Sequence, residues 1–110
     1  MSAAEGAGAN GGGAGGVDFL AHDAGDHVAV AVRDVAPGEA TVGWLSSPER
    51  RSVQVSEPVP FGHKVALAAL GDGEAVVEYG VPVAVTTKAV TAGSLVHTHN
   101  VRSDKWQSMR

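Results

Sequence analysis

Three short segments share one pattern, and this pattern constrains the fold more than any other feature of the chain. In each segment an apolar residue precedes two turn-forming residues, a glycine and a short β-rich run. The segments begin Val35-Ala-Pro-Gly38, Leu70-Gly-Asp-Gly73 and Val90-Thr-Ala-Gly93. Because glycine adopts backbone conformations that other residues resist, each segment predicts a corner with one apolar residue beneath it. The spacing is too irregular for a solenoid, so we expect a small, folded-over β-sheet with several corners.

The remaining periodicity also favours β-structure. Short runs rich in β-branched residues are separated by turn residues, and they cover residues 28–32, 41–44, 52–55, 75–77 and 83–87. Residues 64–70 differ, because they are good helix formers and are followed by Gly71. The sequence therefore predicts a mainly β domain with one short helix.

Length and composition limit the chain to one domain with a thin core. It has 110 residues, of which 44% are hydrophobic but only 5% aromatic, so Ala and Val must supply most of the buried surface. Trp44 and Trp106 are the expected anchors of the core or of an interface. The first 16 residues are mostly Gly and Ala, which cannot recover their ordering entropy through burial. We therefore predict a disordered tail over 1–16 and a folded domain over 17–110.

Several classes of protein are excluded. The chain has no cysteine, which rules out disulfides, thiolate metal sites and a cysteine nucleophile. With 12 acidic and 8 scattered basic residues, it has a formal charge of −4 and lacks the basic surface of a nucleic-acid-binding protein. Neither a signal peptide nor an apolar run long enough to span a membrane is evident, so we expect a cytoplasmic protein.

The five histidines are the most informative residues. His97 and His99 lie at the end of a predicted strand, where residues two apart share a face. Two such imidazoles can chelate a divalent metal or hold a carboxylate, with the amide of Asn100 beside them. From the spacing alone, two exposed histidines at the end of a strand are the simpler interpretation.

Two further clusters also allow a functional and a structural interpretation. His63 and Lys64 fall at the start of the predicted helix, where they could bind an anion together with free backbone N–H groups. Alternatively His63 caps or packs against the helix and Lys64 is solvated. Residues 22–27 hold two histidines and two aspartates, which could complete a metal site or form an ordinary polar loop.

Five motifs occur together and in the same order in one known family. They are Phe19-Leu-Ala-His22-Asp-Ala-Gly-Asp26, Gly43-Trp44, Pro60-Phe-Gly-His-Lys-Val-Ala-Leu67, Gly73-Glu-Ala-Val-Val-Glu-Tyr-Gly80 and Val96-His-Thr-His-Asn-Val-Arg102. Over about residues 18–106 the chain resembles the small subunit, or N-terminal SAF domain, of the altronate and galactarate dehydratase family. The first two motifs are most similar to those of its sulfolactate sulfo-lyase branch, in which the small subunit is a separate chain.

This resemblance implies a β-clip fold of SAF type and a lyase activity. The expected reaction removes water or sulfite from a hydroxy acid, either an altronate-like sugar acid or sulfolactate. It further implies a large catalytic subunit as partner and a divalent metal, Fe²⁺ or Mn²⁺, as cofactor. A non-catalytic SAF-type module that binds a sugar acid or a partner chain is the alternative function, and a self-associating β-domain with surface histidines is a third possibility.

The resemblance also assigns roles to individual positions. It implies catalysis by His63 and Lys64, substrate binding by His99 and Asn100, and metal ligation by His22 and His97. Elimination beside a carboxylate needs a base for the α-proton and positive charge for the developing enediolate, and His63 with Lys64 suits the second task. The base itself remains unassigned between this chain and its partner. His27 departs from the family pattern and is expected to be a peripheral surface residue.

Overall fold

A computed structural model describes residues 16–103, which form nine strands and no helix. The strands are β1 (Phe19–Ala21), β2 (Val28–Ala31), β3 (Gly38–Trp44), β4 (Ser47–Val55), β5 (Lys64–Ala66), β6 (Ala75–Glu78), β7 (Val81–Thr86), β8 (Leu95–Val96) and β9 (Val101–Ser103). The predicted mainly β architecture is confirmed. Within residues 16–103 there is no helix that could cross a membrane. Trp106 and nearly all of the predicted tail lie outside the described residues.

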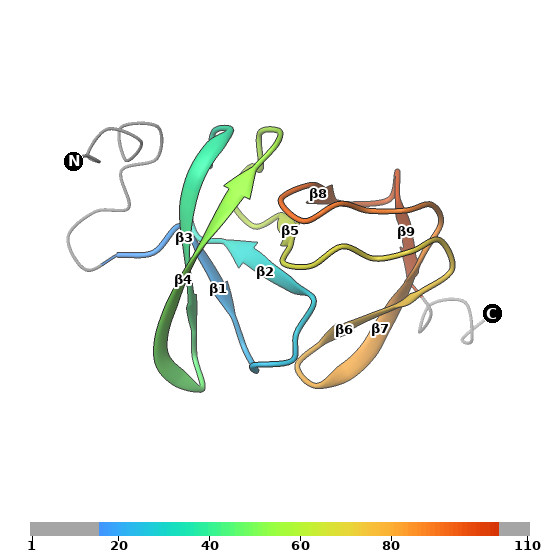
Figure 1. The fold of residues 1–110 in the computed structure, drawn as a ribbon, viewed down its shortest axis with the longest axis horizontal. Coiled ribbons are helices and arrows are strands. Elements are labelled where there is room, and N and C mark those ends of the chain that lie inside the picture. Colours follow the sequence, from blue (N-terminus) through green and yellow to red (C-terminus); the bar gives the residue numbers. More distant parts are fainter. Residues whose placement is uncertain (1–15, 104–110) are drawn as a thin grey trace.

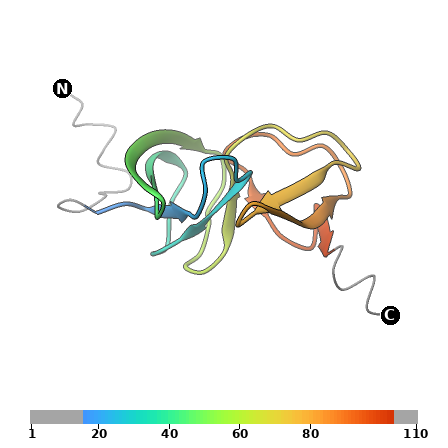
Figure 2. The same ribbon diagram turned by 90° about the horizontal axis from the view of Figure 1, so that it is seen from below.

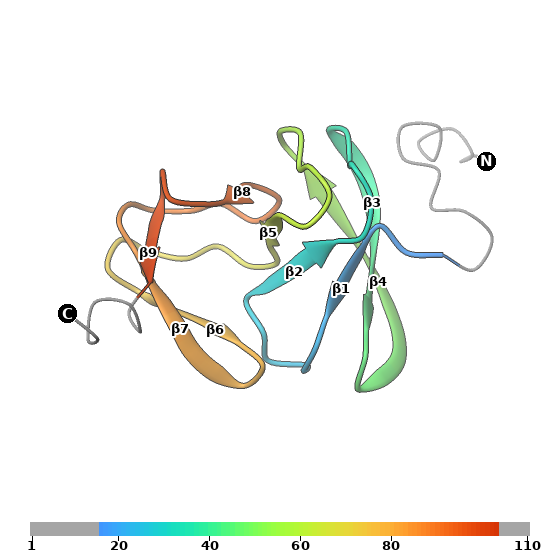
Figure 3. The same ribbon diagram turned by 180° about the vertical axis from the view of Figure 1, so that it is seen from behind.

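The strands form two sheets that lie side by side. Six strands form one sheet in the order β4-β3-β1-β2-β5-β8, and β6-β7-β9 form the other (Figure 1). Adjacent strands are antiparallel except for β1 and β3, which run parallel. Figures 2 and 3 show the same arrangement from below and from behind, and β5 and β8 occupy the middle of the molecule. Residues on β5 and β8 are therefore close to both halves of the fold.

The three predicted corners are present, and each has the expected geometry. Gly38, Gly73 and Gly93 all have positive φ angles, of 129°, 75° and 90°. The apolar residue that opens each segment is buried, with Val35, Leu70 and Val90 between 2% and 4% exposed. The pattern therefore corresponds to a repeated structural corner.

The structure also contains a fourth copy of the same corner. Val59 is fully buried, Gly62 has a φ angle of 85°, and β5 follows directly. The apolar residues pair through reciprocal backbone hydrogen bonds, Val35 with Val59 at 2.9 Å and Leu70 with Val90 at 2.8 Å. The four corners therefore form two pairs, which turn the chain back on itself twice.

The predicted short helix over 64–70 is wrong. Lys64–Ala66 is strand β5, which pairs with β2 on one side and β8 on the other. A helix of about two turns is marginal in water even when its residues favour helix, because nucleation is costly. The corner at Gly62 and the hydrogen bonds on both edges of β5 outweigh that local preference.

Two hydrophobic clusters stabilise the fold, and β5 separates them. Val65 belongs to the cluster around Phe19 and Trp44, whereas Ala66 belongs to the cluster that contains Leu70. This is the alternation expected of consecutive residues on a strand. As predicted, most buried hydrophobic residues are Val or Ala. Trp44 is buried in the core, and the guanidinium carbon of Arg51 lies 5.3 Å from the centre of its ring.

Candidate functional site

His63 and His97 face each other across the β5–β8 pair. In this antiparallel pair Lys64 is opposite Val96, so the register places His63 opposite His97 just beyond the end of the paired strands. Their ring centroids are 5.1 Å apart and the ring planes are inclined by 52°. The fold thus brings together two histidines that are distant in the sequence, and it joins the two motifs that sequence analysis considered separately.

One nitrogen of His63 is buried without a partner. Its Nδ1 atom forms no hydrogen bond with any residue of the described range. Buried polar atoms in native proteins are nearly always hydrogen-bonded, so an unpartnered one points to a group outside the chain or to a functional requirement. No hydrogen bond constrains the His63 ring within residues 16–103, and its interaction with His97 is its one ring contact there.

Lys64 lies on the other face of the sheet from the histidine pair. Its register partners are Val30 and Val96, and its Nζ atom is 3.2 Å from Oε1 of Glu78 on β6. Glu78 is only 6% exposed, so the ammonium compensates a nearly buried carboxylate. His63 and Lys64 therefore do not form one cationic cluster in this chain, and no helix N-terminus accompanies them.

The segment with His97 and His99 is a turn, which corrects the expectation that both residues lie on one strand face. Strand β8 ends at Val96, and Asn100 closes the turn with its side chain. Its Oδ1 atom accepts from the N–H of His97 at 3.0 Å, and its Nδ2 atom donates to the carbonyl of Leu95 at 2.8 Å. Asn side chains stabilise turns in this way. Asn100, only 4% exposed, holds His97 in place, whereas His99 is exposed and has no hydrogen bond within the described residues.

Asp26 is a buried carboxylate surrounded by backbone donors. Its Oδ2 atom accepts from the N–H groups of His22, Asp23 and Tyr79 at 3.3, 3.1 and 3.1 Å, and Oδ1 accepts from Gly80 at 3.1 Å. Burial alone would raise the pKa of Asp26, but these four hydrogen bonds outweigh it and lower the pKa below its ordinary value of 3.8. One carboxylate thereby joins the β1–β2 connection to the β6–β7 turn.

His22 stands at this junction and not beside His97. Its ring is 4.8 Å from that of Tyr79, and its Nδ1 atom is 3.2 Å from Oδ1 of Asp23. His97 instead contacts His63. The structure therefore gives the two predicted metal ligands different partners. Between residues 16 and 103, no three His, Asp or Glu side chains gather closely enough to hold a metal ion.

His27 is a structural residue and not the peripheral surface residue expected from the sequence. It is half-buried, its Nδ1 atom accepts from the N–H of Val77 at 3.0 Å, and its own N–H donates to the Val77 carbonyl at 2.8 Å. These two bonds connect the start of β2 to β6 and so join the two sheets. The ring tautomer with Nδ1 as acceptor places the proton on Nε2.

Sequence reasoning did not single out Glu78 or Tyr79, although a signal for Glu78 was present. Alternation along the strand places Glu78 on the same face as Val76, which is buried. A glutamate at an inward position needs a cationic or hydrogen-bonding partner. Tyr79 carries no comparable signal, since its φ angle of 58° depends on the tight turn between β6 and β7.

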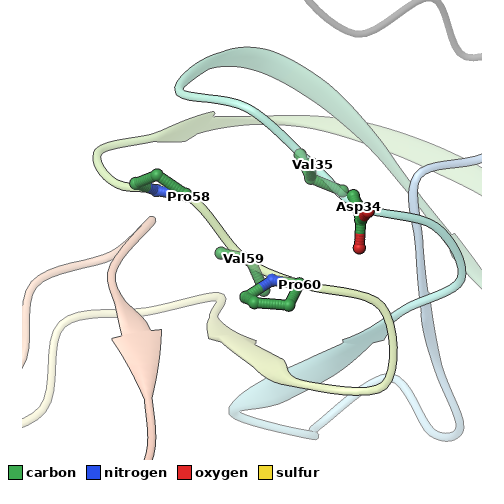
Figure 4. A pocket seen from close by; sticks show the side chains of 5 residues that line it. All are labelled: Asp34, Val35, Pro58, Val59 and Pro60. Carbon is green, nitrogen blue, oxygen red and sulfur yellow. The ribbon is translucent and has the colours of Figure 1, made fainter.

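The pocket found in the structure is separate from the histidines. It has a volume of about 230 Å³ and is lined by Asp34, Val35, Pro58, Val59 and Pro60 (Figure 4). Asp34 is its one charged lining residue, and Oδ1 of Asp34 accepts from the N–H of Phe61 at 2.9 Å. A small apolar pocket without a cationic group is poorly suited to an anionic substrate. The histidines therefore remain the candidate site residues.

Comparison with known families agrees with the corner pattern and the motifs. Residues 17–104 match the family model described as "Altronate/galactarate dehydratase SAF domain". The chain belongs to this family. The SAF architecture is consistent with the two small sheets and four corners.

Two kinds of relatives with known activities share this SAF domain. The (2R)-sulfolactate sulfo-lyase subunit alpha of Chromohalobacter salexigens is 35% identical over 92 residues, which cover 82% of this chain and 98% of that protein. The altronate dehydratase of Escherichia coli is also 35% identical, over 72% of this chain but only 15% of its own length. The altronate dehydratase of Bacillus subtilis is 28% identical with the same coverage. The domain thus occurs as a separate subunit in one case and as a small part of a longer chain in the other.

Proposed function

We propose that this chain is the small subunit of a two-subunit lyase that eliminates water or sulfite from a hydroxy acid. The relatives support the proposal. The segment that matches this chain makes up 98% of a sulfo-lyase subunit alpha but only 15% of an altronate dehydratase. The pocket of about 230 Å³ within the described residues is lined by no histidine. A substrate site completed by a large subunit accounts for both facts.

The chemistry of such an elimination defines what the residues must do. A base removes the proton on the carbon that carries the carboxylate, and the electron pair passes to the carboxylate as an enediolate. The bond to the leaving group then breaks, as C–O for water or C–S for sulfite, and the enol product becomes a 2-keto acid. Groups that stabilise negative charge as it develops contribute most to the rate of such a reaction.

The His63–His97 pair is the observation on which this proposal rests. Two imidazoles with centroids 5.1 Å apart can donate hydrogen bonds to a carboxylate or accept a proton from a substrate. Lys64 is already paired with Glu78, so its charge is partly compensated, and we assign it a supporting role beside the site. His99 is exposed next to the pair and is free to contact the substrate.

A divalent metal, Fe²⁺ or Mn²⁺, is part of this proposal. The two imidazoles could supply at most two ligands from this pair, and residues 16–103 contain no cluster of three ligating side chains. A metal at this site would need its other ligands from the large subunit, where it would supply positive charge for the enediolate.

Reconstitution with a large subunit tests the proposal. This chain matches only 15% of altronate dehydratase. For the experiment, the large subunit is defined as a protein from the same organism that resembles the rest of altronate dehydratase. The two purified proteins are mixed and offered sulfolactate or an altronate-like sugar acid, and sulfite and 2-keto acid are measured. We expect a stable complex and turnover of one substrate. A complex without turnover would favour the non-catalytic binding module, and the absence of any complex would refute the subunit assignment.

Substitution of single histidines separates a catalytic role from a binding role. His97→Ala is expected to lower kcat by about 100-fold or more, as for loss of a proton-transfer or charge-stabilising group. His99→Ala is expected mainly to raise KM. Both variants should still assemble with the large subunit, because neither ring contributes to a hydrophobic cluster.

A further inference from the structure

Within residues 16–103, three of the four large hydrophobic side chains that are exposed lie at hairpin tips on one edge of the molecule. Leu45 is 65% exposed at the β3–β4 tip, and Tyr79 and Val81 are 55% and 52% exposed at the β6–β7 tip. Together with His22 we call these residues the tip surface. Both tips and the β1–β2 connection between them lie along the lower edge of Figure 1 and face the viewer in Figure 2.

Hydrogen bonds join these three segments into one edge. The N–H of Leu45 donates to the Ala21 carbonyl at 2.9 Å, and that of Ser46 donates to the His22 carbonyl at 3.2 Å. On the other side, Asp26 accepts from Tyr79 and Gly80 at 3.1 Å each. The edge is therefore held in a fixed arrangement before any partner binds, which lowers the entropic cost of association.

Tyr79 has an unfavourable backbone conformation at the β6–β7 tip of this edge. Its φ angle of 58° is the one positive value for a non-glycine residue within 16–103, and its ring contacts His22 at 4.8 Å while remaining half exposed. A bulky residue in this region of φ is strained, and such strain concentrates at functional positions. Tyrosine is also enriched among the residues that dominate binding energy at protein interfaces.

We propose that the tip surface is where the large subunit docks. This inference rests on the proposed function, and it goes further by assigning the contact to Leu45, Tyr79 and Val81. Tyr79 directly follows Glu78, whose carboxylate is 3.2 Å from Nζ of Lys64, so the tip surface adjoins the supporting lysine on the face away from the His63–His97 pair. A subunit that covers this edge would lie beside Lys64.

The partner is identified by length and by chemistry. The matched segment makes up 98% of a protein named as a subunit alpha and 15% of an altronate dehydratase, so in the first case the rest of the enzyme would be a separate chain that this domain has to bind. The complementary surface on the large subunit should be apolar, with a polar group for the Tyr79 hydroxyl. A core of apolar and aromatic side chains with a polar rim is typical of stable subunit interfaces.

The experiment compares variants of the tip surface with a matched control in binding to the large subunit defined above. Leu45→Ser and Tyr79→Asn each remove an exposed apolar group, and Asn tolerates the positive φ at position 79. Phe61→Ser is the control, because Phe61 is 68% exposed but belongs to the 56–63 connection at the opposite edge in Figure 1. Circular dichroism and thermal melting confirm that each variant is folded.

We expect Leu45→Ser and Tyr79→Asn each to raise Kd by about tenfold or more, as for central interface residues. Phe61→Ser should raise Kd by less than either tip variant does. If the wild-type chain binds the large subunit and both tip variants bind it with the same Kd, the assignment of the docking surface is wrong but the proposed function is not. The assignment is also wrong if the isolated chain forms a homodimer that the Leu45→Ser substitution dissociates. The tip surface would then bind a second copy of this chain. Failure of the wild-type chain to bind the large subunit would refute the proposed function as well.

Discussion

Asp26→Asn is expected to destabilise the protein strongly, although it changes a single atom of the side chain. In the structure Oδ2 of Asp26 accepts three backbone N–H groups and Oδ1 accepts one. An asparagine can place its oxygen at the position of Oδ2, but its NH₂ group then faces the N–H of Gly80. The variant therefore loses one acceptor outright and turns three charge-assisted hydrogen bonds into neutral ones.

The size of the effect follows from those four bonds. Hydrogen bonds to charged groups contribute about 1.5–3 kcal/mol each and neutral ones about 1 kcal/mol, while their losses are not additive. We expect the free energy of unfolding to fall by about 2–4 kcal/mol, which corresponds to roughly 10–20 °C in Tm for a domain of this size. Asp23→Asn is the matched control, since within residues 16–103 its half-exposed carboxylate contacts only the exposed His22 ring at 3.2 Å, an interaction that should contribute less than about 1 kcal/mol.

The difference between wild type and Asp26→Asn should depend on pH in a defined direction. The pKa of Asp26 is lowered in the folded state, so the native protein binds this proton less tightly than the unfolded chain does. The stabilisation is therefore complete above the ordinary value of 3.8 and is lost as pH falls below it, through the lowered pKa of the folded state. At neutral pH the full difference should be observed.

Urea unfolding of both full-length chains at pH 7, 5 and 3 measures this difference. We expect the gap between wild type and variant to be equal at pH 7 and 5 and smaller at pH 3. Equal stability of the two proteins at pH 7 would show that the four hydrogen bonds do not hold the edge together. A gap that stays constant down to pH 3 would show that the charge of Asp26 is not its source.

Two further predictions concern the corners and the ion pair. Gly93→Ala should cost more stability than Gly73→Ala, because a Cβ at position 93 would lie 1.9 Å from the Gln54 carbonyl oxygen whereas nothing lies within 4 Å at position 73. Thermal melting should show that Gly73→Ala lowers the free energy of unfolding by about 1 kcal/mol, because of the positive φ, and that Gly93→Ala lowers it by clearly more. Equal losses would contradict the close approach of position 93 to the Gln54 carbonyl. Lys64→Met should lower the free energy of unfolding by about 1–3 kcal/mol by leaving Glu78 without its cation, and adding Glu78→Gln should restore part of it. A double variant no more stable than Lys64→Met would contradict this pairing.

The sequence predicted the corners well because their physical cause is local. A positive φ at glycine and one apolar residue under the turn are properties of four consecutive residues, and they hold at Gly38, Gly73 and Gly93. The fourth copy, Val59 to Gly62, fits the same rule but is not among the three segments that the sequence pattern predicts. The helix-favouring residues that follow it gave a stronger local signal than the corner did.

The candidate site could be predicted only as a set of residues, because its arrangement depends on non-local pairing. The sequence indicates both His63 and His97, but its spacing groups His63 with Lys64 and His97 with His99. The β5–β8 register places His63 opposite His97 and sends Lys64 to the other face, towards Glu78. Strand register between distant segments is set by the whole sheet and cannot be derived from spacing along the chain. Asn100 was likewise expected to bind substrate but is engaged in a backbone turn.

The most direct test of the account is the activity of the reconstituted complex with His63→Ala beside wild type. The ring of His63 contacts His97, and its Nδ1 atom has no partner within residues 16–103, so its removal should leave the fold and the complex intact. We predict that the complex assembles normally and that kcat for keto-acid release falls by about 100-fold or more. An assembled complex that turns over its substrate at the wild-type rate would contradict the claim that this small domain contributes catalytic groups.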